Sequence, residues 1–211
     1  MLGVFLLVRM YRGSNLMKPL FIVLDGIDGC GSTTHVKLLK KWFNDQNLNV
    51  RITHEPTKSD IGMLIKDYLK SNKGFPEVDA LLFAADRAQH TKEIKSLLES
   101  QINVISDRYI ESSICYQSNS GVDINWIKQI NKFALKPDIC IILDIDPKVA
   151  IERIKKDRSE FEKFEKFEIL KDVREKFLDR ARQLNYEIIN TEAPIFIVHE
   201  KIIKIIKKKL D

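Results

Sequence analysis

The fold is decided by one stretch, Leu20-Phe21-Ile22-Val23-Leu24-Asp25-Gly26-Ile27-Asp28-Gly29-Cys30-Gly31-Ser32-Thr33-Thr34. It opens with an apolar run typical of a buried strand, and apolar side chains recur at helical spacing after it. A strand, a glycine-rich turn and a helix, in this order, are the context that a phosphate-binding loop requires. The glycines let successive backbone N–H groups face one anion, and the start of the helix adds the positive end of its dipole.

The spacing of this loop matches G-x-x-x-x-G-K-[ST] at every defined position but one. Gly26, Gly31 and Thr33 are in register, whereas Ser32 stands where the lysine belongs. We predict that Thr33 binds Mg²⁺ and that a cation from elsewhere in the chain takes the place of the lysine. The reason is that phosphoryl transfer depends on positioning and charge neutralisation. The alternative is a glycine-rich turn that binds no ligand.

A second acidic signal follows the apolar run 103–106. Asp107 stands at the carboxyl end of this predicted strand, beside the phosphate loop, where ligands bind in open α/β sheets. Its carboxylate is expected to hold the metal directly or through water, and Arg108 to bind phosphate. The alternative interpretation is a helix cap with its own salt bridge.

The rest of the chain alternates short apolar runs with helical patterns, which predicts one α/β domain with a parallel sheet. The predicted strands are 20–24, 50–53, 103–106, 139–143 and 187–189, and the predicted helices are 33–44, 77–98, 147–155 and a tail from Pro194. Residues 1–16 are interpreted as an upstream extension or the product of a misplaced start codon. Residues 17–211 form the predicted domain.

Composition narrows the function classes further. The chain has 211 residues, a hydrophobic fraction of 44% and a net charge of +5, without a basic arm or a nucleic-acid-binding signature. Its three cysteines have no metal-ligand spacing and fit a reducing cytoplasm better than a disulfide scaffold. No segment predicts a membrane span. We therefore expect a cytoplasmic protein with neither nucleic acid nor a membrane as partner.

Several ordered motifs resemble the thymidylate kinase family from about Lys18 to Lys201. They are Gly26-Ile27-Asp28-Gly29-Cys30-Gly31, Glu55-Pro56, Leu82-Phe83-Ala84-Ala85-Asp86-Arg87-Ala88-Gln89-His90, Asp107-Arg108-Tyr109, Ser112-Ser113-Ile114-Cys115-Tyr116-Gln117, Lys136-Pro137-Asp138 and Asp144-Ile145-Asp146-Pro147. The resemblance implies a P-loop kinase fold with a five-stranded parallel sheet flanked by helices and a short basic lid at about 153–166. It further implies a homodimer and the phosphorylation of dTMP to dTDP with Mg²⁺ and ATP.

The same resemblance implies roles for individual residues. The ATP site comprises the loop residues Gly26, Ile27, Asp28, Gly29, Cys30, Gly31, Ser32, Thr33 and Thr34, together with Arg153 of the lid. On the dTMP side, Phe83 resembles the ring that stacks on thymine, Arg87 the contact to its carbonyl edge or to the phosphate, and Tyr116 the ring that disfavours a 2′-hydroxyl. The remaining expected dTMP contacts are Asp28, Glu55, Pro56, Lys58, Arg108, Ser113 and Gln117. Without the resemblance, Phe83 and Tyr116 also read as core aromatics and Arg87 as a solvated helix residue.

Two departures from the family pattern bear on catalysis. Ser32 replaces the usual lysine, and 57–60 replaces a glycine-rich continuation, so that Lys58 is only a weak acceptor contact. We predict that Arg158, Lys155 or Lys156 of the lid reaches the γ-phosphate, so that the expected catalytic residues are these three with Asp28 and Arg108. The alternative for the lid charges is a solvated face.

Phenylalanine recurs at every third position over 161–167, which predicts a packed helical ridge or the aromatic side of a mobile lid. Two further functions stay open beside the dTMP kinase. One is a nucleoside monophosphate kinase of broader acceptor range, and the other is a nucleotide-binding protein with a degenerate phosphate loop.

Overall fold

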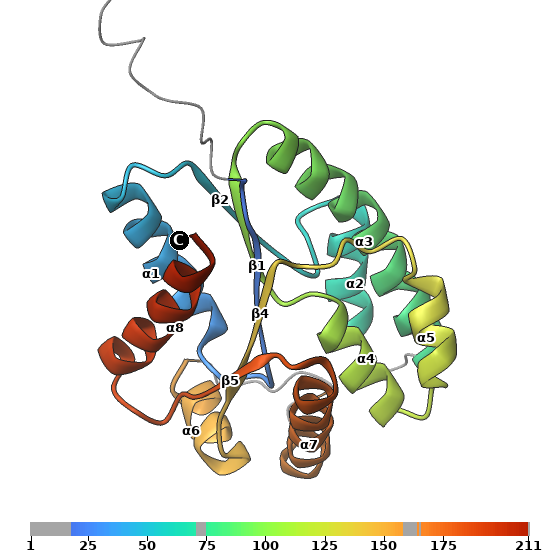
Figure 1. Cartoon of the computed structure of the whole chain (residues 1–211). Coiled ribbons are helices and arrows are strands. Elements are labelled where there is room, and N and C mark those ends of the chain that lie inside the picture. The colour runs from blue at the N-terminus through green and yellow to red at the C-terminus, as the bar shows by residue number, and fades with distance from the viewer. Residues whose placement is uncertain (1–17, 71–74, 158–163, 165, 211) are drawn as a thin grey trace, which may run out of the picture.

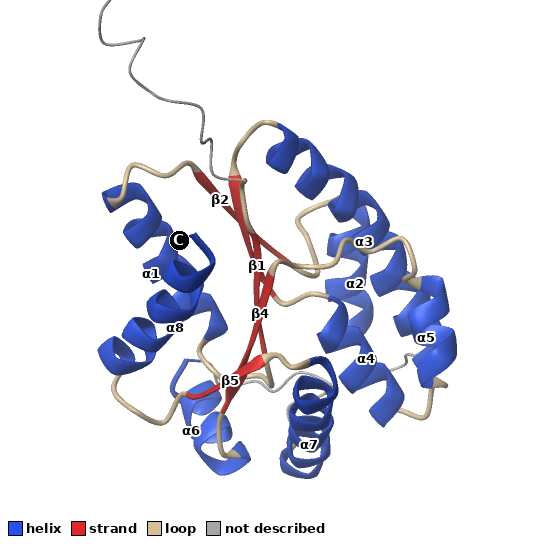
Figure 2. Cartoon of the chain, viewed as in Figure 1, coloured by secondary structure: helices blue, strands red, loops and turns tan. Residues whose placement is uncertain are grey.

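The structure, a computed structural model of the chain, describes residues 18–70, 75–157, 164 and 166–210. The described residues form an α/β sandwich around one five-stranded sheet (Figures 1 and 2). The strands are β1 (Phe21–Asp25), β2 (Val50–His54), β3 (Asn103–Asp107), β4 (Ile139–Asp144) and β5 (Glu187–Asn190). The helices are α1 (Ser32–Asp45), α2 (Asp60–Lys70), α3 (Pro76–Glu99), α4 (Ile110–Asn119), α5 (Ile124–Ile130), α6 (Pro147–Asp157), α7 (Phe167–Leu184) and α8 (Ile195–Leu210).

The sheet is parallel throughout, with the strand order β2-β3-β1-β4-β5. The chain leaves β1 toward one edge and later returns to add β4 on the other side of β1. This reversal makes the carboxyl end of β1 the switch point, where open α/β sheets bind ligands. All five predicted strands are confirmed, each within one residue of its expected bounds.

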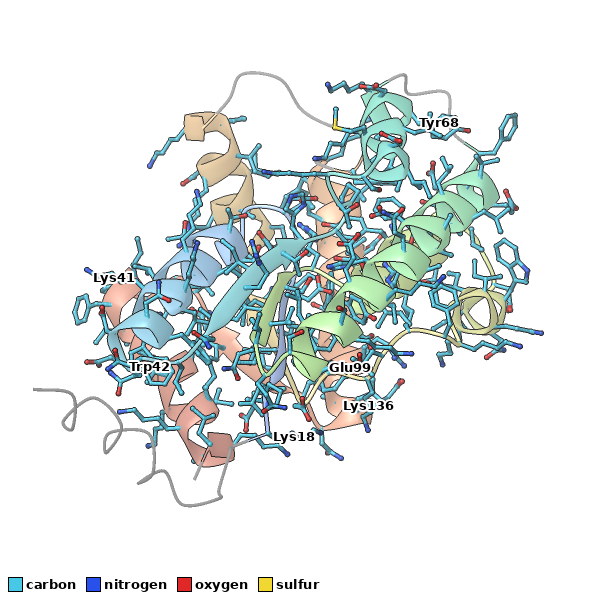
Figure 3. All side chains as sticks on the ribbon, turned by 90° about the horizontal axis from the view of Figure 1, so that it is seen from above. Lys18, Lys41, Trp42, Tyr68, Glu99 and Lys136 are labelled. Carbon is cyan, nitrogen blue, oxygen red and sulfur yellow. The ribbon has the colours of Figure 1, made fainter. Side chains whose placement is uncertain are left out.

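The helices cover both faces of the sheet. In Figure 1, α1 and α8 lie on one face, whereas α2, α3, α4, α5 and α7 lie on the other. Figure 3 accordingly places Lys41 and Trp42 of α1 on the opposite side of the molecule from Tyr68 of α2. Coverage of both faces explains why the central strands β1, β3 and β4 are almost entirely buried apolar runs.

The main core joins the central strands to the buried faces of α1, α7 and α8. Leu39 and Phe43 of α1 and Ile202 of α8 are fully buried, as the helical spacing of their apolar residues predicts. Among the described residues, no helix combines the length and the apolar character that a membrane crossing needs. The loops that follow β1, β2 and β3 thus extend from a sheet whose centre is held by this core.

Candidate active site

The phosphate loop runs between β1 and α1 and is shaped by its glycines. Gly29 and Gly31 have φ angles of 81° and 91°, in the left-handed region that favours glycine. A Cβ on Gly29 would lie 2.6 Å from the carbonyl oxygen of Ala150 in α6, so only glycine fits there. Ile27 and Cys30 are buried in the core behind the loop, and burial raises the pKa of the Cys30 thiol to about 11.

The start of α1 is open to an anion. Gly31 is its N-cap, and no side chain caps the helix. The first N–H groups of a helix have no acceptor within the helix, so those of Ser32, Thr33 and Thr34 form a ready anion site. All three residues line one large cleft of about 1620 Å³. Ser32, which stands in place of the lysine, is largely buried.

The two predicted metal-binding residues lie together beside this loop. The Thr33 hydroxyl donates to Oδ2 of Asp107 at 2.5 Å, because Asp107 ends β3, the strand next to β1. Mg²⁺ prefers oxygen ligands and keeps several waters, so a hydroxyl and a carboxylate at a phosphate loop fit this ion. Within the described ranges, no cluster of three or more His, Cys, Asp or Glu side chains forms a metal site of the all-protein kind.

Arg108 lies on the other side of the loop and is held by three contacts. Nη2 donates to Oδ1 of Asp28 at 2.5 Å, and Nη1 donates to the Gly26 carbonyl at 2.8 Å and to Oγ of Ser112 at 2.9 Å. Burial alone would lower the pKa of this guanidinium, but the charge of Asp28 and other nearby groups raises it above its ordinary value. Arg108 is therefore a fixed cation at the mouth of the phosphate loop.

Tyr116 of α4 completes this cluster. Its hydroxyl donates to Oδ2 of Asp28 at 2.8 Å, and its ring lies 5.7 Å from Cζ of Arg108. Burial raises the pKa of Tyr116 well above its usual value, so the hydroxyl stays protonated. The ring of Phe164, the only residue of the segment 158–165 that the structure describes, lies 5.4 Å from the Tyr116 ring.

Arg87 is fully buried and is bound by other protein groups. Its guanidinium donates to Oε2 of Glu55 at 2.6 and 2.9 Å, to Oδ1 of Asn131 at 2.6 Å and to Oγ of Ser113 at 2.8 Å. A solvated helix residue, the alternative read from the sequence, is wrong for Arg87, because packing of α3 against α4 and α5 encloses it. Five N–H groups belong to a guanidinium, so these bonds leave one Nη1 hydrogen for a further acceptor.

Two other residues expected on the dTMP side belong to helices α3 and α4. Phe83 lies one turn earlier on α3 and is half-buried. Gln117 of α4 is buried, and its side-chain oxygen has no hydrogen-bond partner among the described residues. A buried acceptor without a partner is costly and calls for an explanation, such as a donor on a bound ligand.

The loop after β2 is bound to α3 by hydrogen bonds that the sequence did not reveal. Asp86 accepts hydrogen bonds from the Thr57 amide at 2.8 Å, from its hydroxyl at 2.6 Å and from the Ser59 hydroxyl at 3.0 Å. Lys58, between these residues, is exposed and lines the cleft. Pro56, after a cis peptide bond, is half-buried.

The buried side chain of Glu55 contacts two residues of α3. It pairs with Arg87, and its Oε1 lies 2.9 Å from Nδ1 of His90. His90 belongs to the α3 motif but carried no predicted role. The sequence did contain a signal for the role of His90. Asp86, Arg87 and His90 are spaced i, i+1, i+4, which places all three within about one helical turn.

The first residues of the predicted lid belong to α6. Arg153 donates to the Thr191 carbonyl at 2.7 Å and to the Gly29 carbonyl at 3.5 Å, which joins α6 to the phosphate loop. Lys155 and Lys156 stand in the last turn of α6, and Lys156 lines the cleft. The prediction for Arg158, half of the residues 153–166 of the predicted lid and Phe161 of the phenylalanine ridge lie outside the described residues.

Comparison with known proteins agrees with this architecture. The family model described as thymidylate kinase matches residues 24–202. A "Probable thymidylate kinase" of Pyrococcus abyssi is 41% identical over 204 residues, which cover 92% of this chain and 98% of that protein. Proteins of the same name from Thermococcus kodakarensis and Methanocaldococcus jannaschii are 42% and 44% identical, cover 90% and 91% of this chain, and are themselves covered to 98%. The chain therefore belongs to the thymidylate kinase family and is an enzyme of that class of nucleoside monophosphate kinases.

Proposed function

We propose that this chain transfers the γ-phosphoryl group of ATP to dTMP in the presence of Mg²⁺, giving dTDP. One observation carries the proposal: the open N-terminus of α1 and the Arg108–Asp28 pair face the same cleft. The first feature suits a polyphosphate donor, and the second places a fixed cation where an acceptor phosphate would approach. The family relatives supply the choice of dTMP.

The proposed mechanism is a direct in-line transfer. The backbone N–H groups at the start of α1 hold the donor phosphates, and Arg108 binds and orients the acceptor phosphate. Thr33 and Asp107 would hold Mg²⁺, which supplies neutralisation of the phosphate charge when bound. The attacking phosphate oxygen is already an anion near neutral pH, so no side chain needs to remove a proton and no covalent enzyme intermediate forms.

Arg108 and Asp28 have different roles in binding the acceptor. Asp28 keeps Arg108 oriented and, with the Tyr116 hydroxyl, presents polar groups to the sugar. Phe83 is assigned to stacking on thymine, an interaction worth about 1–3 kcal/mol per base. We assign Gln117 and the remaining Nη1 hydrogen of Arg87 to the base edge, because these buried groups retain unused hydrogen-bonding capacity.

The place of the missing lysine is assigned to a lid cation: Arg158, Lys155 or Lys156. Ser32 contributes a hydroxyl but no charge, and Lys156 lines the cleft that Ser32 also lines. Arg158→Ala is then expected to lower kcat far more than it weakens dTMP binding. Near-normal kcat in this variant and in both lysine variants would overturn the assignment.

A coupled assay across dTMP, dUMP, dGMP, dCMP and UMP tests the acceptor. Strong preference for dTMP supports the proposal, comparable rates across several pyrimidines favour the broader kinase, and preference for a purine overturns the roles of Phe83 and Arg87. Because Ser32 lacks the charge of the usual lysine, a protein that binds nucleotide without turning it over is the remaining alternative. Thermal shifts with ATP and dTMP but no turnover of any acceptor would establish that alternative.

A homodimer and a cytoplasmic location complete the proposal. Met63 and Leu64 of α2 and Leu81 of α3 expose about half of their surface, and Phe75, just before α3, exposes 70%. Exposed apolar side chains gathered on two packed helices suit a partner surface, here a second copy of the chain. Sedimentation of the full chain and of Leu64→Glu tests this, since the variant should shift the population toward monomer.

The domain assignment is tested by truncation. We propose that 17–211 is the functional unit and that 1–16 is dispensable for the reaction. A chain that begins at Met17 should keep the kcat and KM of the full chain. A large loss of activity without a loss of stability would assign a role to the segment.

A further inference from the structure

Asp25, the last residue of β1, is tied to the beginning of α4. Its Oδ2 accepts hydrogen bonds from the backbone N–H groups of Tyr109 and Ser112, both at 3.1 Å. Its Oδ1 accepts from the Gly26 amide at 2.9 Å and from the Ser112 hydroxyl at 2.6 Å. The side chain has no exposed surface.

This carboxylate does the work of a helix cap from a distant strand. Tyr109 is the N-cap of α4, and its own side chain makes no capping bond. Ser112 is the third residue of α4, so its N–H is one of those that lack a partner within the helix. Asp25 satisfies it and also places a negative charge at the positive end of the helix dipole.

The turn that Asp25 holds contains Arg108 in an unusual conformation. Its φ angle is +69°, in the left-handed region that non-glycine residues rarely adopt. Such a conformation costs about 1–3 kcal/mol and persists only where surrounding contacts fix it. The Arg108 amide donates to the Leu24 carbonyl at 2.9 Å and its carbonyl accepts from Ser106 Oγ at 2.7 Å, while Asp25 binds the next residue.

Ser112 connects Asp25 to the Arg108 side chain as well. Its hydroxyl donates to Asp25, and its oxygen accepts from Nη1 of Arg108 at 2.9 Å. The carboxylate thus acts on both the backbone and the guanidinium of the arginine that faces the cleft. The two oxygens of Asp25 already accept four hydrogen bonds from protein groups, so we do not expect this side chain to contact a substrate itself.

We propose that Asp25 is a positioning residue of the phosphoryl-transfer site: it holds Arg108 in its left-handed conformation and aims the guanidinium at the acceptor phosphate. The inference rests on the proposed function for the identity of that acceptor. A buried carboxylate that merely stabilised the fold would not need to bind both the amide that follows Arg108 and the hydroxyl that contacts its guanidinium.

The test compares Asp25→Asn with Asp138→Asn in the full chain. Asn keeps the size of the side chain but loses the charge and one acceptor oxygen. Asp138 is the matched control, because it accepts a hydrogen bond from the Phe21 amide at 2.9 Å at the opposite end of the same strand. Asp25→Asn should lower kcat/KM for dTMP about tenfold to a hundredfold, the range for losing one hydrogen bond to a charged group. Asp138→Asn should leave it within about twofold.

A double-mutant cycle with Ser112→Ala tests the linkage to Arg108. If Asp25 and Ser112 act as one unit, the double variant should be about as impaired as Asp25→Asn alone. Losses in kcat/KM that multiply would overturn the proposal, as would Asp25→Asn with unchanged dTMP kinetics.

Hydrogen exchange separates this inference from the proposed function. The amides of Tyr109 and Ser112 should lose protection in Asp25→Asn but not in Asp138→Asn, whatever acceptor the enzyme uses. If the wild-type chain had no dTMP kinase activity, the proposed function would be wrong, but hydrogen exchange would still test whether Asp25 holds the turn at Arg108. Unchanged protection of both amides would remove the positioning role itself.

Discussion

Glu55, the residue that follows β2, and Arg87 of α3 form an ion pair at 2.6 Å in which both side chains are buried. Through this pair, α3 holds the loop that borders the cleft. Removing one partner of a buried pair leaves an uncompensated charge, so Arg87→Ala should destabilise the fold by about 3–5 kcal/mol. Chemical denaturation measures this.

The matched control for Arg87 is Arg182→Ala on α7, whose partner Asp179 is three residues away and exposed. Exposed pairs contribute about 0–1 kcal/mol, so the free energy of unfolding of this variant should be close to that of the wild type. Equal losses in the two variants would contradict the role of burial.

Asp86 should control the position of Lys58 through the loop that it binds. In Asp86→Asn the amide cannot accept all the bonds from Thr57 and Ser59, so the melting temperature should fall and KM for dTMP should rise. Glu99→Gln, an exposed change at the end of α3 and away from the cleft, is the control. A lower melting temperature with unaltered KM would show that the loop contributes stability only.

The glycines of the loop and of a surface turn allow a paired test. Gly121 also has a left-handed φ, of 95°, but nothing lies within 4 Å of its virtual Cβ, so Gly121→Ala should cost only about 1–2 kcal/mol of backbone strain. Gly29→Ala adds a clash with the Ala150 carbonyl and should cost more. It should also weaken ATP binding, as measured by titration calorimetry. Equal stability and unchanged ATP affinity would contradict the close packing.

Stability should fall with acidification because of His35. Burial, with help from His199 of α8 and Arg153 of α6, lowers the pKa of His35 from 6.5 to about 4. Below about pH 6.5 the unfolded chain therefore binds more protons than the folded chain, and the free energy of unfolding falls as the pH falls toward 4. Urea unfolding at about pH 7 and about pH 5 should show a smaller loss in His35→Gln. An identical loss in both proteins would contradict this.

The strands were predictable because central parallel strands are apolar on both faces and end in sharp turns. The position of Asp107 beside Thr33 followed from the same reasoning, since neighbouring parallel strands end at one edge of the sheet. Helix α1 was predicted to within one residue at each end. The bounds of helices α2, α4, α5 and α7 were not predicted. In α4 the reason is visible, because its buried face carries the polar residues Glu111, Ser113 and Gln117 and breaks the apolar pattern.

The partners of the buried polar groups were beyond prediction from sequence. Asp25 and Ser112 are 87 positions apart, and no local pattern reveals that they bond. Arg87 shows the same limit: only the packing of three helices decides that its guanidinium is enclosed rather than solvated. Whether its remaining hydrogen reaches a nucleotide stays a prediction.

The backbone of Gly29 rests directly on that of Ala150, with no room for even a methyl group between them. Arg153 of α6 also donates to the Gly29 carbonyl, so two contacts couple this helix to the phosphate loop. We therefore expect a tilt of α6 to displace the anion site as well, so that movements of the two elements are linked.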